Sequence, residues 1–314
     1  MNTFQEIKDR IDKSSYIIVT AHVNPDGDAI GAGLALTLAL KKLGKKARFV
    51  LQDLNPQTTD FLEGIDNVEQ YSLAENYQND LTICVDCAAE GRLGSTKALL
   101  VGRDSINIDH HISNNSYGTY NYVADASSTS EIIFSLLKFC NIEIDKAIGE
   151  ALYTGLVNDT GNFKHDNVKE STFLMAAELK RIGVDNCKII REFWDTRSFA
   201  AIRLVGKAMY EMRFDNEKKL AYYFMTKDVL DKYNGRKEDT EGIVENLLSL
   251  REANVSLFLR EDKIGFIKGS MRSKNDIDVN EIAALFGGGG HKKAAGFSST
   301  LPGEEIIRIV LEKL

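Results

Sequence analysis

The chain has 314 residues, of which 43% are hydrophobic and 27% are charged, a composition that excludes a largely disordered protein. The length favours two domains of ordinary size. With 46 acidic against 39 basic residues the net charge is −7, which excludes a protein that holds long nucleic acids through a global positive field.

We expect neither a leader sequence nor a membrane anchor in the amino-terminal segment. Charged residues interrupt the first 13 residues, and the longest apolar stretch, 29–40, is about a dozen residues long, too short to cross a bilayer. The cysteines are too few to predict a disulfide framework: Cys84, Cys87, Cys140 and Cys187. We expect a cytoplasmic protein with reduced thiols and no membrane partner.

The first 125 residues alternate short apolar runs with one helical pattern. Residues 28–44 predict a helix ending at a glycine, and four bounded apolar runs predict buried strands at 16–23, 47–51, 81–87 and 105–111. This order is typical of an α/β domain with a parallel sheet.

Helical patterns continue to about residue 212. Ser128 and Glu131 have the spacing of a capping box, and the helical runs cover 132–139, 146–161 and 168–183. We interpret 184–212 as a long, charged connecting helix. The predicted organisation is a catalytic domain over 1–195, a connecting helix or linker over 196–214, and a second domain over 215–314.

The second domain is predicted to be a smaller mixed α/β domain. Its strand-like and helix-like runs interleave, with strands expected at 218–226, 254–260 and 263–272 and helices at 241–250, 279–286 and 304–314.

The strongest functional signal is the placement of histidines beside aspartates at the ends of predicted elements. His22, Asp26 and Asp28 form an HxxxDxD motif directly after the first strand, where open parallel sheets bind ligands. Gly27 allows a tight turn between the two carboxylates, and the positive end of the next helix faces the same place.

Residues at three further element ends should lie at the same edge of the sheet. Asp86 ends the second central strand, Asp109, His110 and His111 end the next, and Asp159 closes a predicted helix. Taken singly, these residues could be helix caps or turn residues. Because all of them stand at element ends, we favour one shared site of carboxylates and imidazoles.

Charge repulsion indicates what this site holds. Clustered carboxylates would repel one another and any phosphate unless cations compensate them, so we predict two divalent metal ions. Mixed oxygen and nitrogen ligands suit manganese, iron, cobalt or zinc, and the lack of cysteine ligands disfavours structural zinc. Manganese is the first choice.

Cys84 and Cys87 form a CxxC, but no second pair of cysteines lies nearby, and we interpret both as small buried apolar residues.

A second group of candidate residues lies in the second domain. Arg272, Ser273 and Lys274 follow a predicted strand, and GGGGHKKAAGF spans 287–297. Open backbone N–H groups in a glycine run can cradle a phosphate, and His291 with its neighbouring lysines adds donors. The run lacks the GK[ST] of a P-loop and follows a helix. We favour substrate binding over a flexible connector.

These motifs resemble a known family. AHVNPDGDAIGA, VDC, NIDHH, GLVNDTGNF and GGGGHKKAAGF look, in this order, like the successive motifs of the DHH phosphoesterase superfamily, and the carboxyl-terminal part looks like its DHH-associated domain. The size of the chain and the order of its motifs resemble one group of this superfamily, the NrnA-like oligoribonucleases (nanoRNases) and pAp phosphatases.

The resemblance implies a role for each matching residue. One metal would be held by His22, Asp26 and Asp86, with Asp86 bridging to a second metal held by Asp28, Asp86, His110 and Asp159. His111 would contact the scissile phosphate and Asp109 would orient its neighbours, so that the catalytic residues are His111, Asp109 and Asp86. Substrate would be bound by Arg272, Ser273, Gly288, Gly289, Gly290 and His291.

The implied function is a two-metal hydrolase of short oligonucleotides and of 3′-phosphoadenosine 5′-phosphate (pAp). Two alternatives stay open: an enzyme selective for linear or cyclic dinucleotide messengers, and a non-catalytic nucleotide sensor. The predicted partners are small nucleotides and short oligonucleotides rather than long nucleic acids. The oligomeric state is undetermined, with a homodimer among the options.

Overall fold

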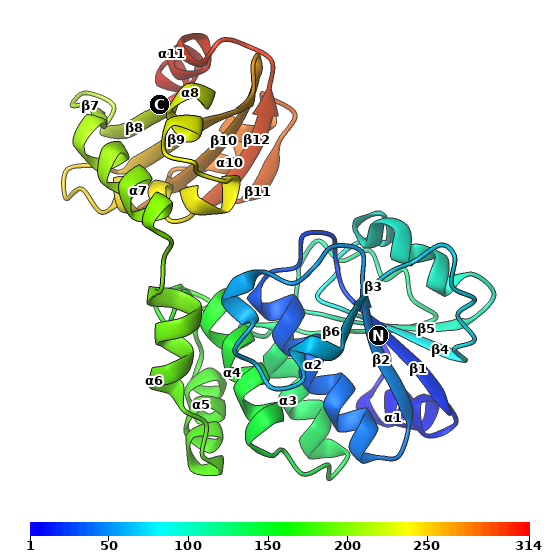
Figure 1. The fold of residues 1–314 in the computed structure, drawn as a ribbon. Coiled ribbons are helices and arrows are strands. Elements are labelled where there is room, and N and C mark those ends of the chain that lie inside the picture. Colours follow the sequence, from blue (N-terminus) through cyan, green and yellow to red (C-terminus); the bar gives the residue numbers. More distant parts are fainter. The chain divides into compact units, whose positions relative to one another are not determined.

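A computed structural model describes residues 1–314 and divides them into two compact units, Met1–Thr196 and Arg197–Leu314 (Figure 1). The division falls one residue beyond the predicted end of the catalytic domain. Each unit has its own sheet and its own hydrophobic core, and each is described separately.

The first unit is built on a six-stranded sheet in which every neighbouring pair is parallel, as the sequence predicted. In spatial order the strands are β3 (Val68–Gln70), β2 (Lys46–Leu51), β1 (Tyr16–Thr20), β4 (Leu81–Val85), β5 (Asp104–Asp109) and β6 (Tyr120–Val123). Its helices are α1 (Phe4–Asp12), α2 (Gly27–Lys42), α3 (Thr129–Phe139), α4 (Lys146–Asp159), α5 (Glu170–Ile182) and α6 (Asn186–Ile189).

The strand order explains where a ligand can bind. The chain leaves β1 through α2 and returns to β2 on one side, whereas β4 lies on the other side of β1. The order therefore reverses beside β1, and such a switch point opens a crevice at the carboxyl ends of the strands. The loop after β1 and the residue after β4 both lie at this point.

Helices α2 and α4 pack closely because small residues face each other between them. A Cβ atom on Gly31 would lie 2.4 Å from the carbonyl oxygen of Ala151, and one on Gly27 would lie 3.0 Å from the Cβ of Asn158. The pairing of early with late residues shows that the two helices run antiparallel. The start of α2, with Asp28, therefore meets the end of α4, with Asp159.

The segment between the two units differs from the single helix predicted over 184–212. Helix α6 continues as a π-helical turn over Ile190–Asp195, the backbone of Thr196 is extended, and a new helix, α7, covers Phe199–Glu211. Ser198 caps α7 by accepting a hydrogen bond from the N–H of Ala201 at 2.9 Å. The second helix is therefore a separate element with its own start.

The second unit contains a mixed six-stranded sheet, as expected for the smaller domain. In spatial order its strands are β11 (Gly289–His291), β12 (Ala294–Ser299), β10 (Phe266–Ser273), β9 (Val255–Lys263), β8 (Leu220–Met225) and β7 (Arg213–Asp215), and only β8 and β9 pair in parallel. Its other helices are α8 (Lys227–Lys232), α9 (Ile243–Leu248), α10 (Val279–Ala284) and α11 (Gly303–Lys313).

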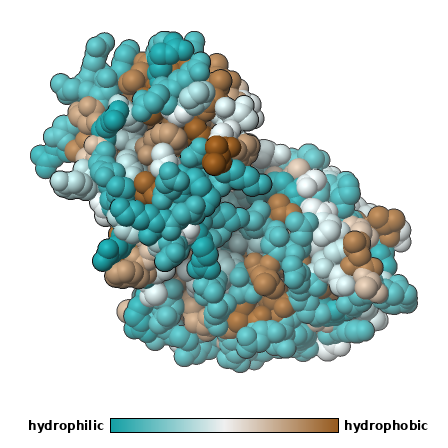
Figure 2. All heavy atoms as spheres, turned by 45° about the horizontal axis from the view of Figure 1, so that its top comes forward, coloured by the Kyte–Doolittle hydropathy of each residue, from teal (hydrophilic) through white to brown (hydrophobic).

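Both faces of this second sheet are covered. Side chains of α10 and α11 pack on one face, and side chains of α7, α8 and α9 pack on the other. Helix α7 buries Leu204 and Ala208 in this core, so it belongs to the second unit. On the face of the molecule seen in Figure 2, hydrophilic side chains dominate and apolar side chains form separate patches. None of the helices is both long and apolar enough to span a bilayer.

Candidate metal centre

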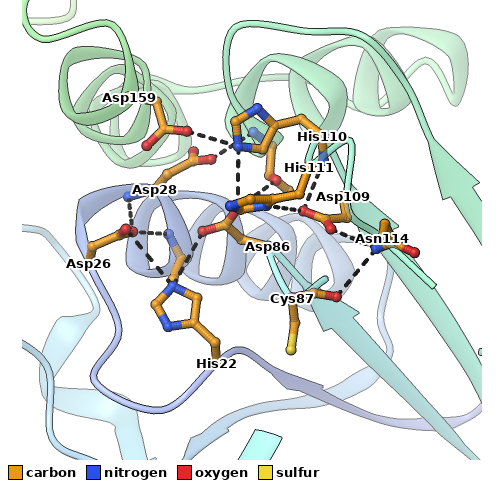
Figure 3. A network of polar contacts seen from close by, with 12 residues as sticks. His22, Asp26, Asp28, Asp86, Cys87, Asp109, His110, His111, Asn114 and Asp159 are labelled. Atoms are coloured by element: carbon orange, nitrogen blue, oxygen red, sulfur yellow. Dashed lines mark hydrogen bonds and ion pairs between the residues drawn. The ribbon is translucent and has the colours of Figure 1, made fainter. Parts of the chain in front are cut away.

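The loop after β1 supplies the first candidate ligands (Figure 3). Asp26 caps α2, because one carboxylate oxygen accepts hydrogen bonds from the N–H groups of Asp28 and Ala29 at 3.0 and 3.1 Å. Its other oxygen lies 3.9 Å from Nε2 of His22. The capping and metal-binding interpretations of Asp26 are therefore compatible, since each uses a different oxygen.

His22 is fixed in an orientation suitable for a ligand. Its Nδ1 lies 2.8 Å from the carbonyl oxygen of Val23, so this nitrogen carries the proton and donates it. Nε2 then holds a lone pair, and it faces the Asp86 carboxylate at 3.5 Å. This arrangement of a buried imidazole is common among metal ligands.

Asp86 lies at the centre of the cluster and is 2% exposed. It follows β4 with a φ of 54°, in the left-handed region, and its N–H donates to the carbonyl of Ile108 at 3.0 Å. Its two oxygens face different imidazoles: Oδ2 faces His22, and Oδ1 lies 3.7 Å from Nε2 of His110 and 3.6 Å from Nδ1 of His111. The carboxylate can therefore serve two neighbouring ions.

The second group of candidate ligands comes from three separate elements. Asp28 at the start of α2, His110 after β5 and Asp159 at the end of α4 have ligand atoms within 4.8 Å of one another. Nε2 of His110 lies 2.9 Å from an oxygen of Asp159, yet this buried nitrogen makes no hydrogen bond of acceptable geometry. A buried imidazole nitrogen without a hydrogen bond, beside carboxylates, is placed as a metal ligand would be. Asp86 lies next to this group, because its Oδ1 is 3.7 Å from Nε2 of His110.

The electrostatics point the same way. Burial, followed by the charges of Asp86 and Asp159, raises the pKa of Asp26 to about 6. Burial likewise raises the pKa of Asp28 well above its ordinary value. Burial lowers the pKa of His110, but the Asp159 carboxylate outweighs it and the net shift is upward. The cluster thus lacks positive charge, which divalent ions would supply, and its donor set fits them.

Asp109 is fully buried but has a different environment. One oxygen accepts from the N–H of His110 at 2.9 Å and from Nδ1 of His111 at 2.7 Å, and the other accepts from Nδ2 of Asn114 at 2.6 Å. With both oxygens engaged by protein donors, Asp109 orients neighbouring side chains. Nε2 of His111 is left available to a ligand.

Among the residues that contact these carboxylates, Asn114 and Thr129 carry no signal in the sequence. Asn114 lies in a turn next to another asparagine, and no pattern separates the two. Thr129, the first residue of α3, donates its hydroxyl to Asp86 at 3.0 Å. A threonine after an N-cap serine is common at helix starts, so only the three-dimensional structure reveals this contact.

Comparison with known proteins identifies the family. Residues 16–156 match the family model described as "DHH family, N-terminal domain", and residues 217–313 match the "DHHA1 domain". A protein of Thermus thermophilus named "Bifunctional oligoribonuclease and PAP phosphatase NrnA" is 32% identical over 95% of this chain and 90% of its own length. The chain belongs to the DHH family. It is a metal-dependent phosphoesterase.

Two further relatives agree with this assignment over nearly the whole chain. A Streptococcus mutans protein named "Probable bifunctional oligoribonuclease and PAP phosphatase NrnA" is 27% identical over 95% of this chain and 94% of its own length. A crystal structure of an exopolyphosphatase-related protein from Bacteroides fragilis matches with a TM-score of 0.91 at 29% identity, covering 99% of this chain and 95% of that one.

In the DHHA1 domain the candidate substrate residues lie on neighbouring strands. Arg272 of β10 pairs with Ala294 of β12, which in turn pairs with His291 of β11, so Arg272 and His291 share one face of the sheet. The Arg272 guanidinium donates to the carbonyl of Met271 at 2.9 Å and forms an ion pair with Glu245 at 2.9 Å. The guanidinium of Arg272 is therefore already paired with a carboxylate.

Two other candidates of this domain are less available than the sequence suggested. The Ser273 hydroxyl is buried and donates to the carbonyl of Ile277 at 2.7 Å. The glycine run is an edge strand rather than an open loop: Gly289 and Gly290 pair with β12, and the N–H of Gly288 donates to the carbonyl of Ala283 at 3.0 Å. His291 is exposed.

In the first unit, a depression of about 550 Å³ lies at the amino ends of β4 and β5, and none of the candidate ligands lines it. The two arginines that line it donate hydrogen bonds within the protein. Arg10 donates to the carboxylate of Asp104 at 2.7 Å, and Arg103 donates to the carbonyl of Asn79 at 3.0 Å. Because their donors are engaged by protein acceptors, we assign no binding role to this depression.

The cysteines of the CxxC are buried, as expected for apolar residues. Cys84 and Cys87 pack in one small cluster with Leu93, and burial raises the pKa of both thiols. Strand β4 ends at Val85, so Cys87 lies in the segment that follows the strand. In this segment Asp86, rather than either cysteine, is the candidate metal ligand.

Proposed function

We propose that this DHH phosphoesterase hydrolyses short oligonucleotides to nucleoside monophosphates and removes the 3′-phosphate of pAp. The observation that carries the proposal is the gathering of carboxylates and imidazoles on both sides of Asp86. The near full-length similarity to the Thermus thermophilus oligoribonuclease and PAP phosphatase supports the substrate class.

We assign the ligands to two metals. His22, Asp26 and Asp86 would hold one ion, because they form one compact group. Asp28, His110 and Asp159 would hold the other, with Oδ1 of Asp86 completing the set: Asp28, Asp86, His110 and Asp159. Manganese is the favoured ion, because the donors are carboxylate oxygens and imidazole nitrogens without thiolates.

In this mechanism the protein groups have distinct tasks. When bound, divalent ions would supply an activated water and neutralise phosphate oxygens. Asp109 holds Nδ1 of His111, which directs Nε2 of His111 toward the reacting phosphate as a hydrogen-bonding group. Asn114 in turn holds Asp109. His111 and Asp86 would be catalytic residues, and Asp109 would act by orienting His111.

In the DHHA1 domain, Arg272 and His291 would bind the substrate. The common sheet face carries a guanidinium and an imidazole on either side of the small Ala294, a suitable pair of donors for phosphate. A phosphate would replace Glu245 as the partner of Arg272. Residues Gly288–Gly290 would let the substrate approach the backbone closely, and Ser273 would brace the turn after Arg272.

A substrate panel tests the proposal. Purified enzyme with manganese is assayed on pAp, on RNA dimers and trimers, and on linear and cyclic dinucleotide messengers at equal concentrations. We expect the highest kcat/KM values for pAp and the RNA dimers and trimers. Preference for the dinucleotide messengers would replace the proposal with that alternative, and binding without turnover of any substrate would favour a sensor.

A further inference from the structure

The amino terminus of α3 lies against the metal centre. Ser128 is the N-cap and accepts a hydrogen bond from the N–H of Glu131 at 3.1 Å. Thr129, the first residue of the helix, is fully buried. It belongs to none of the motifs that supply the candidate ligands.

Thr129 bonds two of these ligands at once. Its N–H donates to Oδ2 of Asp28 at 2.6 Å, and its hydroxyl donates to Oδ1 of Asp86 at 3.0 Å. Asp28 lies at the start of α2 and Asp86 follows β4, so one residue connects carboxylates from two elements. The N–H of Ser130 donates to the other oxygen of Asp28 at 2.9 Å.

These bonds leave the carboxylates able to bind metal. A carboxylate oxygen has two lone pairs, so an oxygen that accepts one hydrogen bond can still coordinate an ion. Donors on the remaining lone pairs fix the direction in which the free ones point. Charge-assisted bonds of this kind are stronger than bonds between neutral groups.

The hydroxyl of Thr129 does not bond within its own helix, unlike the hydroxyls of two other buried helical threonines. Thr37 in α2 and Thr154 in α4 donate to the carbonyl four residues earlier, at 2.7 and 2.9 Å. Thr129 opens its helix and donates to a carboxylate that lies 43 positions away in the sequence. Its β-branched side chain has restricted χ1 freedom, which suits a positioning role.

We propose that Thr129 is a positioning residue that holds Asp28 and Asp86 in the geometry that binds the metals, and that its hydroxyl thereby sets metal affinity. This inference rests on the proposed assignment of both carboxylates as ligands. The backbone N–H contribution is insensitive to the side chain, so substitutions at Thr129 isolate the hydroxyl.

The test is manganese binding to metal-free protein by isothermal titration calorimetry. Removing the hydroxyl with Thr129→Val should weaken the affinity by about 10–100-fold, the range found when groups that hold metal ligands are mutated. Thr129→Ser should restore most of the affinity. Thr37→Val, which deletes a buried threonine hydroxyl elsewhere in the same unit, should bind manganese as the parent does.

Thermal unfolding of the metal-free variants checks that each one folds, and Thr129→Ala replaces Thr129→Val if the valine variant does not. Parental affinity in the hydroxyl-free variant, equal losses in Thr129→Ser, or an equal loss in Thr37→Val would each overturn the inference. Asp86→Ala is measured alongside. If it binds two ions as the parent does, the proposed metal assignment itself fails; if it loses metal while Thr129→Val does not, only the role of Thr129 fails.

Discussion

At Asp86, backbone conformation and side-chain position are linked. A left-handed backbone in a residue other than glycine is unfavourable and persists only where its surroundings impose it, often at functional sites. Here the bond from the Asp86 N–H to Ile108 extends the pairing of β4 with β5, and the φ of 54° turns the chain directly after it. The turn places the carboxylate among His22, His110 and His111.

Asn114 gives a test of how His111 is oriented. Asn114→Ala removes the donor that holds Asp109, so we expect kcat to fall by about 10–100-fold. Metal content should be unchanged, because both oxygens of Asp109 are directed at protein donors. Steady-state kinetics and metal analysis of the purified variant measure the two effects.

The neighbouring Asn115 provides the matched control. Its side chain is exposed, so Asn115→Ala should leave kcat at the parental value. If Asn114→Ala also has parental kcat, the chain from Asn114 through Asp109 to His111 does not contribute to the reaction. If Asn114→Ala loses metal instead, Asp109 belongs among the ligands.

Arg272 tests the substrate role of the DHHA1 domain. Losing a charge-assisted hydrogen bond to phosphate costs about 1.5–3 kcal/mol, so Arg272→Ala should raise KM by roughly 10–100-fold. Arg308→Ala is the control, because Arg308 is also paired with carboxylates but lies on α11. Unchanged KM values for every substrate of Arg272→Ala would remove Arg272 from the binding site.

Sequence reasoning reached the candidate ligands because their chemistry is visible in their type and place. A histidine or aspartate at the end of a predicted strand or helix is unusual enough to notice, and six such residues converge in the structure. Thr129 and Asn114 could not be found in this way. Both are ordinary residues of helix starts and turns, and their role depends on contacts between separate segments.

At the scale of elements, the crossing of α2 and α4 determines the second group of ligands. The two helices approach closely at Gly31, and their antiparallel direction brings Asp28 to Asp159. The sequence predicted both helices but not this contact. The strand order was equally inaccessible, because the outer strands β3 and β6 are short and only partly buried.

Gly31→Ala tests the importance of this crossing. The added methyl group would lie 2.4 Å from a backbone oxygen of α4, which cannot move without moving the helix. Overpacking of this kind costs about 1–3 kcal/mol of the free energy of unfolding. We expect lower thermal stability by calorimetry and weaker manganese binding, since Asp28 moves with α2.

A second helical glycine serves as the control for backbone effects. Gly206 lies exposed in α7 with no atom near its would-be Cβ, so Gly206→Ala should stabilise its own unit by about 0.5–1 kcal/mol. Equal or greater stability of Gly31→Ala would show that α2 and α4 can separate without cost. The metal centre would then not depend on their close approach.

At the scale of the whole molecule, charge argues against a long substrate. The net charge of −7 gives no general attraction for a polyanion. The basic residues predicted to receive substrate are few: Arg272, Lys274, Lys292 and Lys293. All four already have partners within the protein: for example, Arg272 pairs with Glu245, Lys274 donates to the carbonyl of Leu250, and Lys292 pairs with Asp276.

The enzyme should therefore prefer RNA of about two to five residues over long single strands, because affinity for a long strand grows with the number of phosphates that basic residues neutralise. A site with few basic contacts gains little from added nucleotides, and proteins that track long single strands use an extended positive groove with stacking aromatic residues. Hydrolysis of 5′-labelled RNA of graded length with manganese measures the preference. Specific activity should fall from dimers and trimers to strands of about 24 nucleotides, because these strands are too long for a binding site that accommodates a short oligonucleotide. Equal or higher activity on the long strands would indicate a processive exonuclease and contradict the proposed function.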